Sequence, residues 1–242
     1  MKELLAERHA LVTGAANGIG LAVAERFRAE GARVSGVDVE RGTEFRFDLA
    51  RTERLPALVD EIEAANGVVD VLVSVAGVYE PAAAVETELA SYRRVLAVNL
   101  DAPVVLAQRC GRGMAERGWG RILSVTSVHA RYSEALGLSY DVAKAGLEGA
   151  TRTFAIELGR HGVLVNALAP GFVRTRMSVV DGRDELESEW FRSIYVENGK
   201  LPLARPADPA EMASHAAWLC SGENTYLTGQ AITVDGGLTV TF

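Results

Sequence analysis

The chain has 242 residues, a formal net charge of −7 and a sequence pI near 5.2. Nucleic-acid-binding proteins usually carry a basic surface that displaces counterions from phosphates, so this acidic balance argues against nucleic acid as a partner. Hydrophobic residues make up 48% and charged residues 24%, which is typical of a folded globular protein. The length suits one large α/β domain, and we expect a small molecule as its substrate.

Only two cysteines are present, Cys110 and Cys220, and neither stands in a metal-binding spacing. We therefore expect two reduced thiols and no metal site. The first ten residues have mixed charges without an apolar core, which argues against a signal peptide. Asp70 interrupts the longest apolar run, well short of the roughly 18 residues of a membrane span. These features predict a cytoplasmic protein without membrane contact.

Short runs rich in β-branched residues alternate with longer amphipathic stretches, and runs such as Val163–Val165 are apolar throughout, as in strands buried on both faces. This alternation predicts a doubly wound parallel sheet with helices on both faces, in a single domain over residues 1–242. The expected strands are His9–Thr13, Arg33–Val37, Val69–Val75, Arg121–Thr126, Val163–Ala167 and Ala231–Val234. The expected helices are Leu21–Glu30, Leu55–Ala65, Tyr92–Arg109, Tyr140–Leu158 and Pro209–Leu219, with one further strand left open around Asp101–Leu123 or earlier.

The least regular stretch runs over residues 171–209 and includes the run Asp181–Asp184. A segment of this length inside a compact domain is more often a functional lid than an inert connection. We therefore expect residues 171–209 to form a substrate-binding loop or lid. The candidate pocket residues are His129, Arg131 and Tyr132, together with Trp190 or Tyr195, although all are equally compatible with ordinary loop positions.

The first expected strand leads through Thr13-Gly14-Ala15-Ala16-Asn17-Gly18-Ile19-Gly20 into a helix. Glycines at such a turn let the backbone approach a pyrophosphate, and the helix N-terminus stabilises the negative charge. A purely structural turn explains three glycines equally well. Asp38 favours the cofactor site, because a carboxylate ending the second strand accepts hydrogen bonds from ribose hydroxyls and repels the 2′-phosphate of NADP.

The sequence thus favours NAD over NADP. Arg33 and Arg41 weaken this preference, because a flexible arginine can bind a phosphate. Asp48 lies in an expected turn, where it either accepts a hydrogen bond from the adenine amine or is simply exposed.

Tyr140 and Lys144 are spaced i and i+4 in a strongly helical stretch, so both side chains lie on one helix face. There the ammonium is expected to favour phenolate over phenol and so lower the pKa of the tyrosine, making it a general acid or base. Ser127 follows an apolar strand at the carboxyl edge of the sheet, where a hydroxyl can hold a substrate oxygen. Asn99 is a weak helix former within an expected helix, which indicates a defined partner for its amide.

In order and spacing these motifs resemble the short-chain dehydrogenase/reductase family over nearly the whole chain. The matching positions are Thr13-Gly14-x-x-x-Gly18-Ile19-Gly20, Asp38, Asp48, Asn99, Ser127, Tyr140-x-x-x-Lys144, Pro170-Gly171 and Val234-Asp235-Gly236-Gly237. The resemblance implies a Rossmann-type fold with about seven strands, a homotetramer or homodimer, and a catalytic tetrad of Asn99, Ser127, Tyr140 and Lys144. It also implies that the lysine binds the nicotinamide ribose and that the asparagine holds a water in a proton relay.

The resemblance further implies a set of residues that bind the cofactor. These are Gly14, Asn17, Gly18, Ile19, Gly20, Asp38, Asp48, Leu49, Ala76, Gly77, Tyr140, Lys144, Pro170, Gly171, Val173 and Thr175. One segment departs from the family pattern, because Ser74-Val75 stands where the family usually has two asparagines. Serine replaces only part of the hydrogen bonding of an amide and valine none of it.

The sequence as a whole predicts an NAD-dependent oxidoreductase that interconverts a secondary alcohol, or a cyclic diol, and its ketone. Oxidation is the expected direction, because the family's biosynthetic ketone reducers tend to use NADP. One alternative is a reductase of 3-oxoacyl thioesters, for whose carrier Arg174 and Arg176 only hint at a basic docking patch. A remote alternative is a non-catalytic NAD-binding sensor or scaffold.

Overall fold

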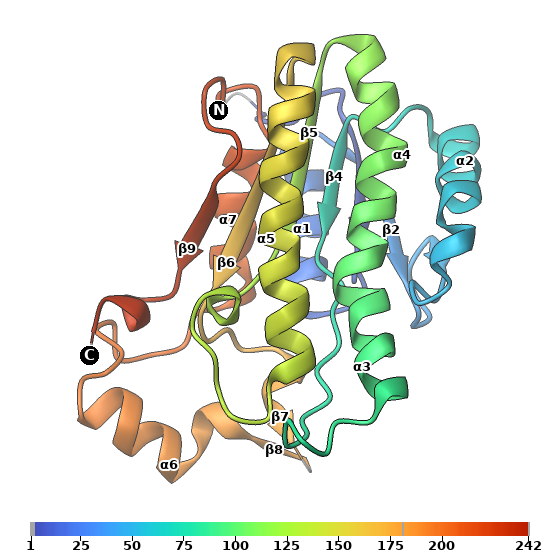
Figure 1. Cartoon of the computed structure of the whole chain (residues 1–242). Helices are drawn as coiled ribbons and strands as arrows, with labels where there is room; N and C mark the ends of the chain where they lie inside the picture. The colour runs from blue at the N-terminus through green and yellow to red at the C-terminus, as the bar shows by residue number, and fades with distance from the viewer. Residues whose placement is uncertain (1–2, 181, 242) are drawn as a thin grey trace.

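The computed structural model describes residues 3–180 and 182–241, which fold into a central sheet between two layers of helices (Figure 1). The strands of the sheet are β1 (His9–Thr13), β2 (Arg33–Asp38), β3 (Phe45–Arg46), β4 (Val71–Ser74), β5 (Gly120–Val125), β6 (Val163–Pro170) and β9 (Ala231–Val234). Within the described chain these seven strands pair in parallel, in the order β3-β2-β1-β4-β5-β6-β9. The predicted doubly wound sheet is confirmed.

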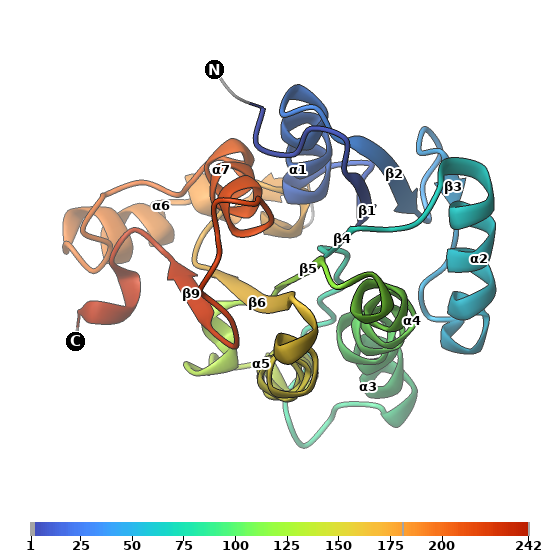
Figure 2. The same cartoon turned by 90° about the horizontal axis from the view of Figure 1, so that it is seen from above.

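Helices cover both faces of this sheet (Figure 2). Their bounds are α1 (Gly18–Ala29), α2 (Leu55–Asn66), α3 (Leu89–Leu96), α4 (Ala102–Arg117), α5 (Leu138–Leu158), α6 (Glu189–Phe191) and α7 (Pro209–Leu219). On one face α1 and α7 pack on the sheet through buried side chains such as Phe27 and Met212. On the other face α2, α4 and α5 do so through Leu58, Leu106 and Ala155.

The chain leaves β1 in one direction and β4 in the other, so the strand order reverses between these two neighbours. In open α/β sheets a ligand binds at such a switch point, beyond the carboxyl ends of the strands. The loops that follow β1, β4, β5 and β6 all meet at this edge (Figure 1). The fold therefore brings the glycine turn, Ser127 and the Pro170-Gly171 step to one end of the molecule.

The stretch predicted as one helix over Tyr92–Arg109 differs from the structure. It divides into α3, a π-helical turn over Ala97–Asp101, and α4. Pro103 lies at the start of α4, where a missing backbone N–H costs nothing, and it cannot lie in a continuous α-helix without breaking a hydrogen bond. The wide turn contains Asn99, whose amide was expected to need a defined partner.

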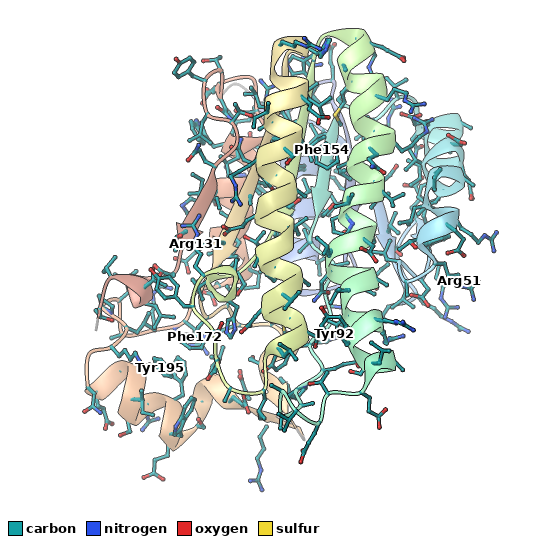
Figure 3. All side chains as sticks on the ribbon, in the orientation of Figure 1. Arg51, Tyr92, Arg131, Phe154, Phe172 and Tyr195 are labelled. Atoms are coloured by element: carbon teal, nitrogen blue, oxygen red, sulfur yellow. The ribbon has the colours of Figure 1, made fainter. Side chains whose placement is uncertain are left out.

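Residues 171–209 form mostly short elements beyond the carboxyl edge of the sheet (Figure 1). A hairpin of β7 (Val179–Val180) and β8 (Arg183–Asp184) precedes α6, and Asp181 lies outside the described residues. The ring centroids of Phe172 and Tyr195 are 4.7 Å apart (Figure 3), and Phe191 lies 5.0 Å from each of them. This aromatic cluster attaches the segment to the end of β6.

Candidate active site

The glycine turn after β1 packs so tightly that side chains are excluded from it. A Cβ on Gly20 would lie 2.0 Å from the carbonyl oxygen of Gly14. Gly14 and Gly18 have φ values of +69° and +54°, a region that favours glycine. The backbone thus forms an open cradle at the N-terminus of α1.

The N-terminal amides of α1 are available to an anion. Asn17 is the N-cap residue, yet its side chain makes no capping hydrogen bond, and the first turn contains no acidic residue. Unsatisfied amides and the positive end of the helix dipole bind phosphate groups. The cradle therefore fits the pyrophosphate of a dinucleotide.

Asp38 lies beside this cradle at the end of β2 and is 8% exposed. One carboxylate oxygen accepts the backbone N–H of Ala16 at 3.0 Å, and the other accepts that of Glu40 at 3.0 Å. The carboxylate is thus fixed next to the turn. Asp48 and Leu49 lie further along: the Asp48 side chain accepts the N–H of Ala50 at 3.0 Å, and Leu49 packs in the core.

The atypical Ser74-Val75 step leaves one polar group unpaired. The buried Ser74 hydroxyl has no hydrogen-bond partner in the structure. The neighbouring hydroxyl of Thr13 accepts the backbone N–H groups of Val75 and Ala76, at 3.1 and 3.2 Å. The Thr13 hydroxyl therefore joins the end of β1 to the loop that contains Ala76 and Gly77.

This difference gives a stability prediction. Thr13→Val should lower the free energy of unfolding by about 1–3 kcal/mol, because two backbone donors lose their acceptor. Ser74→Ala should change it by no more than about 0.5 kcal/mol, since the removed hydroxyl has no partner. Urea unfolding of both variants measures the difference, and a larger loss from Ser74→Ala would contradict this account.

Tyr140 lies in the first turns of α5, partly buried between two aromatic rings. Its ring is edge-on to those of Tyr79 and His129, with centroids 5.5 and 5.8 Å away. Ser127 interacts with the phenol and by itself lowers the pKa of Tyr140. The two residues predicted to handle the substrate oxygen thus lie close together at the carboxyl edge of the sheet.

The expected direction of the tyrosine pKa is wrong. Burial raises the pKa of Tyr140 to about 12, outweighing the hydrogen bond from Ser127. The Lys144 ammonium is 5.4 Å from the ring centroid and donates to the Val125 carbonyl at 2.8 Å instead of contacting the phenol oxygen. Burial also lowers the pKa of Lys144 to about 8, so both groups are poised closer to their neutral forms.

Asn99 is fully buried and its amide makes two hydrogen bonds to the backbone of Val78. Its oxygen accepts the Val78 N–H and its nitrogen donates to the Val78 carbonyl, both at 2.8 Å. A Cβ on Gly77 would lie 3.4 Å from the Asn99 oxygen and 3.7 Å from the Lys144 nitrogen. Asn99 therefore fixes the loop after β4 beside Lys144, while its amide keeps one N–H and one oxygen lone pair that Val78 does not use.

The segment that begins at Pro170-Gly171 passes close to the glycine turn after β1. The N–H of Gly171 donates to Val234 at 3.1 Å, and Val173 is buried in the core. A Cβ on Gly18 would lie 3.3 Å from the Thr175 methyl group. Arg176 forms an exposed ion pair at 2.7 Å with Glu40, which lies just after the end of β2. The start of segment 171–209 thus covers part of the glycine turn.

The predicted pocket residues are distributed unevenly. His129 faces Tyr140, and Tyr195 lies in the aromatic cluster of the lid (Figure 3). Arg131 instead pairs with Glu148 on α5 at 3.1 Å, and Tyr132 and Trp190 are 55% and 54% exposed. Sequence reasoning missed Tyr79, which packs on Tyr140 and follows the Ala76-Gly77 pair closely.

A cavity of about 470 Å³ lies within segment 171–209 rather than beside Tyr140. It is lined by Arg174, Leu186, Glu187, Phe191, Arg192, Val196, Glu197, Ala204, Arg205 and Pro206. Across residues 3–180 and 182–241, no group of three His, Cys, Asp or Glu side chains is arranged to hold a metal ion. In the same ranges no helix combines the length and apolarity needed to cross a membrane.

A glycine cradle at the switch point of a doubly wound sheet defines a dinucleotide-binding class of protein. A family model described as Enoyl-(Acyl carrier protein) reductase matches residues 14–239. A cis-4-hydroxycyclohexanecarboxylate dehydrogenase of Sinomonas cyclohexanicum is 34% identical over 258 positions, covering 99% of both chains. A galactitol 2-dehydrogenase (L-tagatose-forming) of Cereibacter sphaeroides is 35% identical over 248 positions, covering 96% of this chain and 94% of the relative.

A solved structure extends the likeness to three dimensions. A gluconate 5-dehydrogenase from Burkholderia cenocepacia J2315, in complex with NADP and tartrate, matches with a TM-score of 0.90 at 28% identity, covering 100% of this chain and 98% of that one. The chain therefore belongs to the short-chain dehydrogenase/reductase family, and its fold is of the Rossmann type. It is an oxidoreductase that uses a nicotinamide cofactor on a secondary alcohol or the corresponding ketone.

Proposed function

We propose that this protein oxidises a secondary alcohol with NAD, using Tyr140 as the general base. The observation that carries the proposal is that the buried Lys144 ammonium lies 5.4 Å from the Tyr140 ring centroid at the carboxyl edge of the sheet, with Ser127 close enough to lower the pKa of the phenol. Ser127 holds the alcohol oxygen, and Tyr140 accepts its proton. NAD held at this site would supply the hydride acceptor, and its positive charge would favour phenolate.

The proposed cofactor site consists of three parts. The cradle at Gly14–Gly20 binds the pyrophosphate, and Asp38 binds the adenosine ribose. Lys144 binds the nicotinamide ribose with the N–H groups that Val125 does not use. The loop at Ala76 and Gly77, the step at Pro170 and Gly171, and Val173 with Thr175 enclose the remainder. Asn99 acts by positioning the loop beside Lys144.

A panel of secondary alcohols, cyclic diols and sugar alcohols tests the function, with NADH absorbance as the readout. The proposal predicts NADH formation from members of this panel. Reduction of 3-oxoacyl thioesters with no alcohol oxidised would support the alternative reductase function, which similarity to 3-oxoacyl-[acyl-carrier-protein] reductases favours.

The preference for NAD rests on Asp38, whose fixed carboxylate would face a 2′-phosphate with a like charge. Asp38→Asn keeps the shape but removes the charge, so it should reduce the ratio of NAD to NADP efficiency by roughly tenfold or more. Ratios of kcat/KM for the two cofactors measure this change. Asp60→Asn on α2 is the matched control, and tighter binding of NADPH than NADH by the unaltered protein would contradict the assignment.

We further propose a cytoplasmic homotetramer or homodimer. Burial raises the pKa of the Cys110 and Cys220 thiols to about 12, so both are inert, as suits a reducing compartment. Light scattering during size-exclusion chromatography measures the oligomeric state.

A further inference from the structure

His129 is held in a defined orientation beside Tyr140. Its Nδ1 atom lies 2.9 Å from a carboxylate oxygen of Asp141, and its backbone N–H donates to the Ser127 hydroxyl at 3.2 Å. Its ring stands edge-on to that of Tyr140. Because Nδ1 faces Asp141, Nε2 is the ring nitrogen left to hydrogen-bond a substrate hydroxyl. The ring stands next to the two groups proposed to bind the reacting alcohol.

The surroundings of His129 are rich in acidic groups. Glu134 places a carboxylate oxygen 3.6 Å from Nε2 of His129, and its charge contributes to raised pKa values of Tyr79 and Tyr195. The Glu134 charge therefore acts both on Tyr79, in the loop after β4, and on Tyr195, in segment 171–209. Asp141 acts on Tyr79 in the same direction. Two carboxylates, those of Glu134 and Asp141, thus lie beside His129 at the reacting end of the site.

We propose that His129, oriented by Asp141 and flanked by Glu134, binds a second hydroxyl group of the substrate and so selects uncharged polyhydroxylated alcohols over alcohols that carry a carboxylate. This inference rests on the proposed alcohol oxidation. A hydroxyl donates to Nε2 or to the Glu134 carboxylate, whereas a substrate carboxylate offers acceptors only. It would also meet like charges in a partly buried site.

The selectivity proposed for this chain differs from the substrates for which some of its relatives are named. The Sinomonas cyclohexanicum and Burkholderia cenocepacia relatives are named for carboxylate-bearing substrates, whereas the Cereibacter sphaeroides relative is named for a neutral sugar alcohol. The acidic group formed by Glu134 and Asp141 favours the last type of substrate for this chain.

Three cyclohexane substrates test the inference with NAD at one fixed pH. They are cyclohexanol, cyclohexane-1,2-diol and cis-4-hydroxycyclohexanecarboxylate. For the unaltered protein, kcat/KM should be highest for the diol and lowest for the carboxylate, with roughly tenfold between diol and cyclohexanol. His129→Phe keeps a ring against Tyr140 but removes both nitrogens, so it should lower the ratio of kcat/KM for the diol to that for cyclohexanol roughly tenfold. Glu134→Gln should raise kcat/KM for the carboxylate alone.

His161→Phe, at an exposed position in the turn after α5, is the matched control and should alter none of the ratios. The inference is overturned if His129→Phe lowers kcat/KM for all three substrates by one common factor, or if the unaltered protein prefers the carboxylate. Either result would leave the alcohol oxidation itself intact. If no alcohol is oxidised by the unaltered protein, the proposed function fails together with the inference.

Discussion

Tyr140→Phe is expected to lower the turnover of secondary alcohols by roughly a thousandfold, within the range that a positioned acid or base contributes. The variant loses the phenol oxygen, to which Ser127 hydrogen-bonds, but keeps the ring that packs against Tyr79 and His129. Fold and cofactor affinity should therefore be preserved. NADH formation measures turnover, and fluorescence titration with NADH measures binding.

Tyr226→Phe is the matched control, because Tyr226 is 97% exposed. It should behave as the unaltered protein. Retention of more than about a tenth of the turnover by Tyr140→Phe would be too small a loss for a general base and would reject this role.

Gly20→Ala is expected to abolish measurable NADH binding. The new methyl group would lie 2.0 Å from the Gly14 carbonyl oxygen and 3.1 Å from that of Thr13, so the cradle must open. The methyl group would displace backbone atoms, which cannot move aside as a flexible side chain can. Overpacking of this kind also lowers the free energy of unfolding by about 1–3 kcal/mol. NADH titration together with thermal unfolding separates the two effects.

Gly159→Ala provides the control for this substitution. Gly159 has a φ of −58°, and a Cβ there meets no atom within 4 Å. It should leave both NADH affinity and stability nearly unchanged. Equal NADH affinity of Gly20→Ala and the unaltered protein would show that the cradle does not hold the cofactor.

The apolar strands were predictable because burial on both faces requires continuous runs. Val71–Val73 and Val163–Val165 lie within β4 and β6. The two-residue strand β3 was missed, since it has too few residues for any periodicity to appear. β6 extends to Pro170, past the predicted end at Ala167, because Pro170 pairs with Val234 of β9. Such pairing depends on distant chain segments.

The candidate site was predictable where a motif needs particular backbone chemistry. The glycines at 14, 18 and 20 have the positive φ values or close contacts that their spacing indicated. The raised pKa of Tyr140 was not predictable, because it depends on how much water the surrounding rings and lid exclude. The hydrogen-bond partners of Asn99 and His129 were not predictable either, because only the folded chain brings Val78 to Asn99 and Asp141 to His129.

The central claim is that hydride passes directly from a carbinol carbon to the nicotinamide beside Ser127, Tyr140 and Lys144. Its most direct test uses a secondary alcohol oxidised by this protein, carrying deuterium on the carbinol carbon, with NAD as the oxidant. The account predicts that NMR finds the deuterium at C4 of the reduced nicotinamide. Deuterium released into water, or reduced cofactor without the label, would contradict it.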